Sequence, residues 1–179
     1  FERSCAGQVS FLLGNHEQWL LRTLRDPTRH SWLLGMRGLT TVRSYSPQAA
    51  DELQAALAEV GPALALERIP LPYDAFFAAM PPAHIEFLQR LRRFVRTPDA
   101  VCVHAGVSPA LMRVEEEPED VLVWGEDEWW QGYSGPDEVV YGHWNNARLD
   151  EGVATPFTFG RTSGIDCVAG GSLLALRLP

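Results

Sequence analysis

Hydrophobic residues recur at two different spacings in the two halves of the chain. In the first half they recur three or four positions apart, the spacing that lines one face of a helix. The helices that this spacing predicts span residues 17–25, 47–60 and 82–95. Pro27 ends the first helix, while Ser46 and Gly61 stand where the second needs an N-cap and a stop.

In the second half, short apolar runs alternate with glycine, which is typical of strands separated by turns. These runs predict strands at residues 100–103, 121–124, 139–141, 155–159 and 172–178, and a similar run predicts an early strand at residues 8–13. Most are too apolar to have a wetted face, so we expect sheets that are covered by helices or by each other. No repeat or low-complexity linker divides the chain, which predicts a single layered α/β domain over residues 1–179.

Composition narrows the setting in which the protein works. With 179 residues, of which 46% are hydrophobic, the chain can bury one substantial core. Its three cysteines, Cys5, Cys102 and Cys167, are odd in number and lack CxxC spacing, which favours a reducing cytoplasm over a disulfide framework. No apolar run approaches the roughly 18 residues that a membrane span needs. We therefore expect a cytoplasmic protein with no membrane partner.

Charge argues against one class of partner. The formal net charge is −8, and acidic residues gather between positions 115 and 128. Such a segment repels a polyanion, so a nucleic-acid duplex is excluded as the expected partner. The segment itself is interpreted as a solvated acidic face.

Three predicted strand ends share one arrangement, a histidine flanked by small residues. They carry Asn15 with His16, His104, and His143. Imidazole and amide oxygen suit a borderline divalent metal, so Asn15, His104 and His143 are candidate ligands of one ion, and His16 is free to move protons. Any one such histidine is more often structural, and it is the repetition that favours a site. The remaining two are expected at the surface: His30 and His84.

The same residues resemble a known family. Gly14-Asn15-His16-Glu17, His104-Ala105-Gly106 and Gly142-His143 are similar, in order, to the third, fourth and fifth motifs of the calcineurin-like metallophosphoesterases. The similarity is closest to the branch of serine/threonine protein phosphatases and bacterial diadenosine tetraphosphatases. Trp124 before the fifth motif and residues 164–173 after it also agree, so the resemblance covers nearly the whole chain.

This resemblance implies a fold and a chemistry. The fold is a layered metallophosphatase sandwich, two mixed β-sheets flanked by helices. The cofactors are two divalent ions of the Mn, Fe or Zn type. Asn15, His104 and His143 would hold the second ion, and His16 would donate a proton to the leaving oxygen. The implied activity is hydrolysis of phosphate esters or anhydrides by a metal-bound hydroxide. The partner would be a phosphorylated small molecule, nucleotide or protein, and the sequence does not choose among them.

The chain also departs from the family pattern at its start. The first two motifs should precede Gln8, and residues 1–7 resemble neither. In the family they supply the first metal's ligands, a phosphate-binding arginine and the aspartate partner of the catalytic histidine. We therefore expect an N-terminally incomplete fold and a chain that is inactive or weakly active alone.

Further departures lie near the fifth motif. Glu126 stands where the family usually has an arginine that clamps phosphate, and Trp144-Asn145-Asn146 replaces the usual Thr-Pro. Arg148 and Arg161 are basic alternatives, although such arginines more often lie at the surface or in salt bridges, and no substrate-binding residue is assigned. The alternative interpretation is a non-catalytic pseudophosphatase that acts as a binding or scaffold protein. The four intact residues Asn15, His16, His104 and His143 favour an enzyme.

Overall fold

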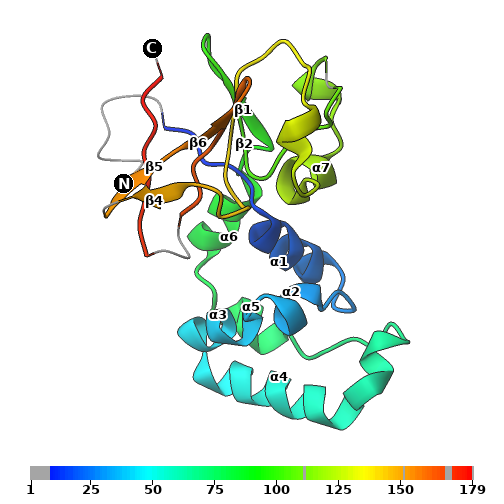
Figure 1. The fold of residues 1–179 in the computed structure, drawn as a ribbon. Helices are drawn as coiled ribbons and strands as arrows, with labels where there is room; N and C mark the ends of the chain where they lie inside the picture. Colours follow the sequence, from blue (N-terminus) through cyan, green and yellow to red (C-terminus); the bar gives the residue numbers. More distant parts are fainter. Residues whose placement is uncertain (1–8, 111, 151, 168–170, 179) are drawn as a thin grey trace. The chain divides into compact units, whose positions relative to one another are not determined.

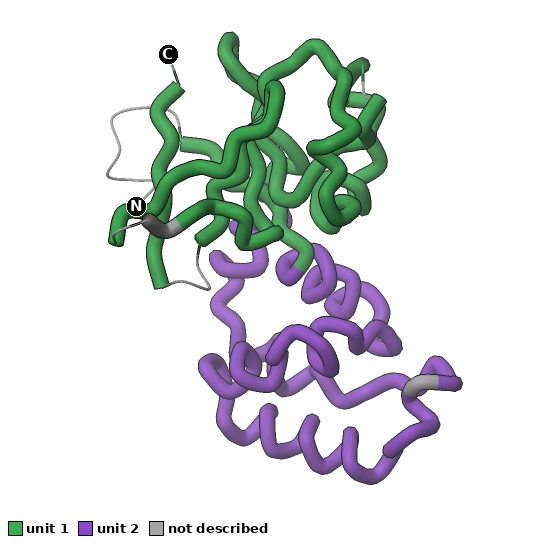
Figure 2. Tube along the Cα trace, viewed as in Figure 1, with its two compact units in different colours: residues 1–15, 91–179 green, residues 16–90 purple. Residues whose placement is uncertain are grey.

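The chain folds into two compact units. The computed structural model describes residues 9–110, 112–150, 152–167 and 171–178. Unit 1 contains residues 1–15 and 91–179, and unit 2 contains residues 16–90, so unit 2 interrupts unit 1 along the sequence (Figure 2). The class is mixed α/β, as predicted. The single domain over residues 1–179 stays a prediction, and the expected segments before Gln8 fall outside the described residues.

Unit 2 is helical. Its elements are α1 (Asn15–Arg25, whose first residue is counted with unit 1), α2 (Ser31–Gly35), α3 (Gly38–Tyr45), α4 (Pro47–Val60), the 3-10 turn η1 (Gly61–Ala65), α5 (Asp74–Ala79) and α6 (Pro82–Gln89). The predicted bounds of α4 are confirmed, because Ser46 accepts a hydrogen bond from the Ala49 amide at 3.1 Å and Gly61 has a positive φ of 55°. The core of unit 2 contains three fully buried side chains, Val42, Leu53 and Phe76.

Unit 1 contains a five-stranded mixed sheet in the order β1-β2-β3-β7-β6. Figure 1 labels three of these strands, β1, β2 and β6. Its strands are β1 (Phe94–Arg96), β2 (Val101–Val103), β3 (Val139–Tyr141), β6 (Phe157–Phe159) and β7 (Thr162–Gly164), and β4 (Arg148–Asp150) with β5 (Val153–Thr155) forms a separate ribbon. The central strands β2, β3 and β7 are parallel, and the outer two pair antiparallel. The described residues thus show one mixed sheet and a ribbon, where two mixed sheets were expected.

Short helical elements cover this sheet. They are the 3-10 turn η2 (Val114–Glu116), the helix α7 (Glu119–Trp124) and the 3-10 turn η3 (Trp129–Gly132). Leu122 of α7 and Trp129 of η3 pack with Val101 and Val139 of the sheet in one buried cluster. No helix in the described part of the chain is both long enough and apolar enough to cross a membrane.

Several predicted elements are wrong in their type or bounds. Residues 121–124 belong to α7, because a four-residue apolar run shows no period, and the preceding Pro118 with acidic residues in the first turn favours a helix. The helix predicted over residues 82–95 ends at Gln89, because residues 94–96 pair with β2 instead. Strands 100–103 and 139–141 are confirmed as β2 and β3.

Three other predicted strands are shorter than expected, divided or unpaired in the structure. Residues 8–13 form a single bridge, Leu12 to Arg92, within their described part. Residues 155–159 divide at Pro156, which cannot donate a ladder hydrogen bond, into the end of β5 and the strand β6. Residues 172–178 have no regular secondary structure, and no strand pairing is found for them among the described residues.

Candidate metal centre at the strand ends of unit 1

His104 and His143 follow two neighbouring parallel strands. β2 and β3 pair in the register Val101 with Val139, so the loops after both strands leave the same edge of the sheet. A backbone hydrogen bond from Gly142 N to His104 O, 2.9 Å long, joins the two loops. The imidazole centroids of His104 and His143 lie 5.1 Å apart with 60° between their planes. The sheet therefore brings these two predicted ligands together.

Asn15, the first residue of α1, lies beside them. Its side chain is 5% exposed, and its Oδ1 accepts a hydrogen bond from His104 Nε2 at 3.1 Å. The backbone just before it is tied to unit 1 by hydrogen bonds from Leu13 N to Arg92 O (2.8 Å) and from Arg92 N to Phe11 O (2.9 Å). All three residues predicted to bind one ion thus lie together in unit 1.

The spacing of these donors fits a single divalent ion. Two metal–ligand bonds of about 2.1 Å place the donor atoms about 3.0–3.4 Å apart at octahedral or tetrahedral angles. The Asn15 Oδ1 to His104 Nε2 distance of 3.1 Å falls in that range. Because Nε2 is a donor in this bond, coordination requires that its proton move to Nδ1 or leave.

The donor set is neutral, however, with two imidazoles and one amide oxygen. No group of three or more His, Cys, Asp or Glu residues gathers to hold a metal within the described parts of the chain. An ion held by Asn15, His104 and His143 would therefore keep its full positive charge unless other groups neutralise it. The described residues fit part of a metal centre.

His143 is held in a strained backbone conformation. Its φ is 68°, which is rare for a residue other than glycine. The Trp144 amide donates to Gly142 O at 2.8 Å, so His143 is the central residue of a three-residue γ-turn with positive φ. Such a conformation costs on the order of 1–3 kcal/mol and persists only where surrounding contacts hold it.

Two tryptophans provide those contacts through one carbonyl group. Trp144 Nε1 donates to Ala105 O at 3.0 Å, and Trp129 Nε1 donates to the same oxygen at 3.1 Å. A Cβ added at Gly106 would stand 2.5 Å from Trp129 Nε1, so only glycine fits there. The residue after each histidine is thereby anchored, Ala105 as acceptor and Trp144 as donor. The sequence analysis missed this role, although the indole of Trp144 in place of the family's usual residues was a signal.

Buried polar atoms without partners lie near the same loop. Tyr141 Oη and both side-chain amide atoms of Asn146 have no hydrogen-bond partner among the described residues. Asn146 and Thr162 lie near the tyrosine hydroxyl without meeting hydrogen-bond geometry, and burial raises the pKa of the Tyr141 phenol. Unsatisfied groups of this kind gather at functional or strained sites in native proteins.

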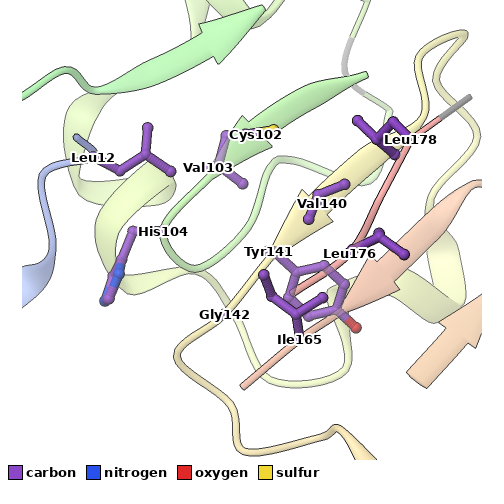
Figure 3. A pocket seen from close by; sticks show the side chains of 10 residues that line it. All are labelled: Leu12, Cys102, Val103, His104, Val140, Tyr141, Gly142, Ile165, Leu176 and Leu178. Atoms are coloured by element: carbon purple, nitrogen blue, oxygen red, sulfur yellow. The ribbon is translucent and has the colours of Figure 1, made fainter. Parts of the chain in front are cut away.

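An apolar cavity of about 360 Å³ adjoins His104 in unit 1. Figure 3 shows side chains of β2 and β3 facing it, with Leu176 and Leu178 from the C-terminal segment. Cys102 also lines it, and burial raises the pKa of this thiol, which keeps it protonated at neutral pH. The cavity supplies a low-dielectric wall beside one candidate ligand.

The other residues considered for the site are exposed. His16 is the exposed second residue of α1 and is counted with unit 2. Glu126 is exposed, as are both candidate arginines. Arg161 pairs with Glu138 at 2.9 Å, and Arg148 stands over the Phe157 ring at 5.7 Å, so the structure gives both arginines contacts other than phosphate.

Two predictions about surface residues are corrected, while His84 is exposed as expected. His30 is 6% exposed, because Nε2 donates to Ile69 O at 2.7 Å and Nδ1 accepts from the Tyr73 hydroxyl at 2.9 Å. Glu117 of the acidic segment is 5% exposed and accepts from Ser108 Oγ at 3.1 Å, so this segment is not solvated throughout.

Comparison with known proteins adds no relative. No protein-family model, curated protein or solved structure matches this chain. These comparisons therefore show no family for this chain.

Proposed function

We propose that the chain is part of a calcineurin-like metallophosphoesterase, a cytoplasmic hydrolase of phosphate esters or anhydrides built on the layered sandwich of that family. The observation that carries the proposal is the convergence of Asn15 and His104, donor atoms 3.1 Å apart, with His143 beside them. Asn15 begins α1, and the two histidines follow β2 and β3, so the three residues come from separate segments of the chain. A structural role alone does not require the strained turn at His143.

In this proposal different residues bind the metal, hold the histidine loops and donate the proton. Two divalent ions of the Mn, Fe or Zn type, when bound, would polarise the phosphoryl group and lower the pKa of water. Asn15 would offer one oxygen, and His104 and His143 would each offer one nitrogen. The indoles on Ala105 O would hold both histidine loops in place. His16 would donate its proton to the leaving oxygen.

Metal binding tests the ligand assignment without requiring turnover. Mn²⁺ added to the 179-residue chain should broaden the NMR signals of the His104 and His143 rings at the lowest metal concentration. His104→Asn should weaken binding at least about tenfold, because one ligand is lost. His84→Asn, at an exposed histidine of unit 2, is the matched control and should leave binding unchanged. If Mn²⁺ broadened the His143 ring signal equally in the wild type and in His104→Asn, His104 would not be a ligand.

Leaving-group dependence tests the role of His16 in the complete gene product. His16→Asn should keep its metal but lose roughly 100- to 10,000-fold in kcat on alkyl phosphates, with a smaller loss on aryl phosphates whose leaving groups need no proton. His104→Asn should lose metal and activity together on both substrates. Equal metal loss in the two variants would make His16 a ligand or a structural residue. Binding of Mn²⁺ and a phosphate ester without turnover would favour the scaffold alternative.

A further inference from the structure

The sheet of unit 1 has two apolar faces, and its own chain covers them unequally. Side chains alternate between the faces along a strand, so the paired residues Val101 and Val139 belong to one face and Cys102 and Val140 to the other. The first face packs against α7 and η3 in a buried cluster. On the second face the described residues leave the apolar cavity of about 360 Å³ that adjoins His104.

The C-terminal segment forms the far wall of this cavity. Leu176 and Leu178 line it and are half-buried, and the residue between them is exposed. Leu12 and Ile165 add further aliphatic side chains, and every lining residue belongs to unit 1. Figure 3 shows His104 and Leu178 at opposite sides, so the cavity extends from the candidate metal centre toward the C-terminal segment.

The lining offers a charge at one end. None of the lining residues that the structure describes is an arginine, an aspartate or a glutamate. His104 can carry a positive charge, and its Nε2 hydrogen-bonds to Asn15 Oδ1 within the candidate metal centre. The ring of Tyr141 packs against Trp129, with 5.0 Å between the ring centroids. An anionic group is therefore favoured at the His104 end, and the rest of the cavity suits an uncharged apolar group.

The volume of the cavity suits a short hydrocarbon chain. Pockets for small molecules begin at roughly 300 Å³, and a dry apolar cavity of about 150 Å³ already holds a six-carbon ring. Aliphatic side chains provide dispersion contacts to such a chain without asking for a polar partner. A hydrocarbon chain in the cavity would also cover apolar surface that the described residues leave uncovered.

We propose that this cavity binds the organic group of the substrate, and that this group is an uncharged alkyl chain. The inference rests on the proposed function, with the phosphoryl group at Asn15, His104 and His143. The water oxygen bonds to phosphorus, and the bond from phosphorus to the ester oxygen breaks. One proton of the water leaves with the ester oxygen as an alcohol, and the other stays on inorganic phosphate. The protein is thus an esterase for alkyl phosphates, and substrates with charged leaving groups, such as pyrophosphate, are disfavoured.

Isoleucine NMR tests the cavity without catalysis. The chain has three isoleucines, Ile69, Ile85 and Ile165, and all three are half-buried. Ile165 lines the cavity, whereas Ile69 and Ile85 lie in unit 2 and are internal controls. 1-Hexanol titrated into the 179-residue chain, ¹³C-labelled at the isoleucine δ1 methyls, should shift Ile165 with a Kd on the order of 1 mM and leave the controls in place.

Glycerol, an alcohol without an apolar chain, is the matched probe in this titration and should shift none of the three methyls. No shift of Ile165 with 1-hexanol would overturn the inference. Equal shifts at all three methyls, or equal shifts with glycerol and with 1-hexanol, would also overturn it.

Chain length tests the substrate preference in the complete gene product. Ethanol and hexanol are similarly poor leaving groups, so ethyl and hexyl phosphate differ mainly in the apolar surface that they bury. Burial of each methylene favours binding by up to about fourfold, and kcat/KM should therefore be at least about tenfold higher for hexyl phosphate than for ethyl phosphate. Equal kcat/KM for the two esters would overturn the inference, and this comparison requires no variant.

A polar side chain in the lining tests which surface sets this preference. Leu176→Gln places an amide in the cavity and should lower the ratio of kcat/KM for hexyl over ethyl phosphate about tenfold. Leu173→Gln makes the same change in the same segment at a residue that is 92% exposed and does not line the cavity, and it should leave the ratio within about twofold. Equal ratios in the two variants would overturn the assignment.

The two proposals fail in distinguishable ways. Hydrolysis of alkyl phosphates without a shift of Ile165 would overturn the cavity assignment and keep the proposed function. A shift of Ile165 with 1-hexanol in a metal-loaded complete protein that hydrolyses no phosphate ester would overturn the proposed function and, with it, the role of the cavity in substrate binding.

Discussion

The loop around His30 in unit 2 and the loop around His143 in unit 1 hold a histidine in opposite ways. His30 is buried, and each ring nitrogen has a partner contributed by residues 69–73. His143 has a φ of 68° and stands beside the rings of His104, Trp124 and Trp144. His30 connects its loop to residues 69–73 through these two hydrogen bonds. The loop around His143 has a strained backbone instead, and its histidine ring lies 5.1 Å from the ring of His104.

The difference separates a histidine with a structural role from the one that the proposed function uses. His30 is the more buried of the two and has a hydrogen-bond partner at each ring nitrogen. His143 has a strained backbone instead, and the proposed metal centre would supply a reason for that cost. The following substitutions test this contrast, beginning with the largest expected effect.

Gly106→Ala should destabilise unit 1 by about 3–4 kcal/mol. The added Cβ would stand 2.5 Å from Trp129 Nε1, so the indole must leave a fully packed site and its bond to Ala105 O. Gly132→Ala is the matched control, because its Cβ would meet Pro109 at an ordinary 3.4 Å. Chemical denaturation of both variants measures the difference. Equal stabilities would show that the indole can shift freely and does not anchor the His104 loop.

His30→Ala should cost about 2 kcal/mol, because it leaves the buried Tyr73 hydroxyl and Ile69 carbonyl without partners. His84→Ala is the comparison, since His84 also contacts a tyrosine hydroxyl, Tyr45, at 2.9 Å but is exposed. Water replaces the lost bond there, and the cost should stay within about 0.5 kcal/mol. Unfolding free energies of the two variants decide whether burial sets the value of this contact. A larger loss of unfolding free energy in His84→Ala than in His30→Ala would contradict this prediction.

The stability of the segment before His30 should depend on pH, because Asp26 titrates there. Hydrogen bonds from the Thr28 hydroxyl and amide, with help from Arg68, lower the pKa of Asp26 to about 2. Because the folded pKa is depressed below its usual 3.8, the stabilisation is present above about pH 4 and is lost as the pH falls toward 2. Asp26→Asn should therefore lower Tm slightly at pH 6 and not at pH 2. A Tm difference that is constant across this range would contradict the assignment.

The smallest effect is expected at Asn145, which follows Trp144 with a φ of 46° and is exposed. Asn145→Gly should be neutral or stabilise by a few tenths of a kcal/mol, since glycine adopts this region freely. Asn145→Ala should destabilise by about 0.5–1 kcal/mol. Denaturation curves of the pair measure the strain in this loop. Equal values would show that the loop relaxes when its sequence changes.

Local patterns were sufficient for elements that local chemistry decides. The helix α4 has its cap at Ser46 and its stop at Gly61 within the predicted bounds, because these signals lie beside the helix in sequence. Residues 90–95 were predicted as the end of a helix because their arginines and apolar positions fit that period. The pairing of residues 94–96 with β2 is a tertiary contact that no local pattern shows.

The candidate site likewise has one part that the sequence could predict and one part that depends on tertiary contacts. Asn15, His104 and His143 could be nominated from the sequence, because each follows an apolar run with glycine nearby. Their convergence depends on the parallel pairing of β2 and β3, and the anchoring of Ala105 depends on Trp129, which is distant in sequence. The burial of His30 likewise depends on residues 69–73. Contacts across such separations leave no period that a sequence pattern could show.

The interruption of unit 1 by unit 2 has a consequence for folding order. Leu13 and Arg92 hydrogen-bond across all the residues between them, and closing so long a disordered loop costs on the order of 4 kcal/mol. Unit 2 is continuous and helical, so its contacts are short in sequence and form quickly. Once unit 2 is compact, that loop is no longer disordered. Asn15 should therefore reach His104 late in folding, and the candidate metal centre should be among the last features of the chain to form.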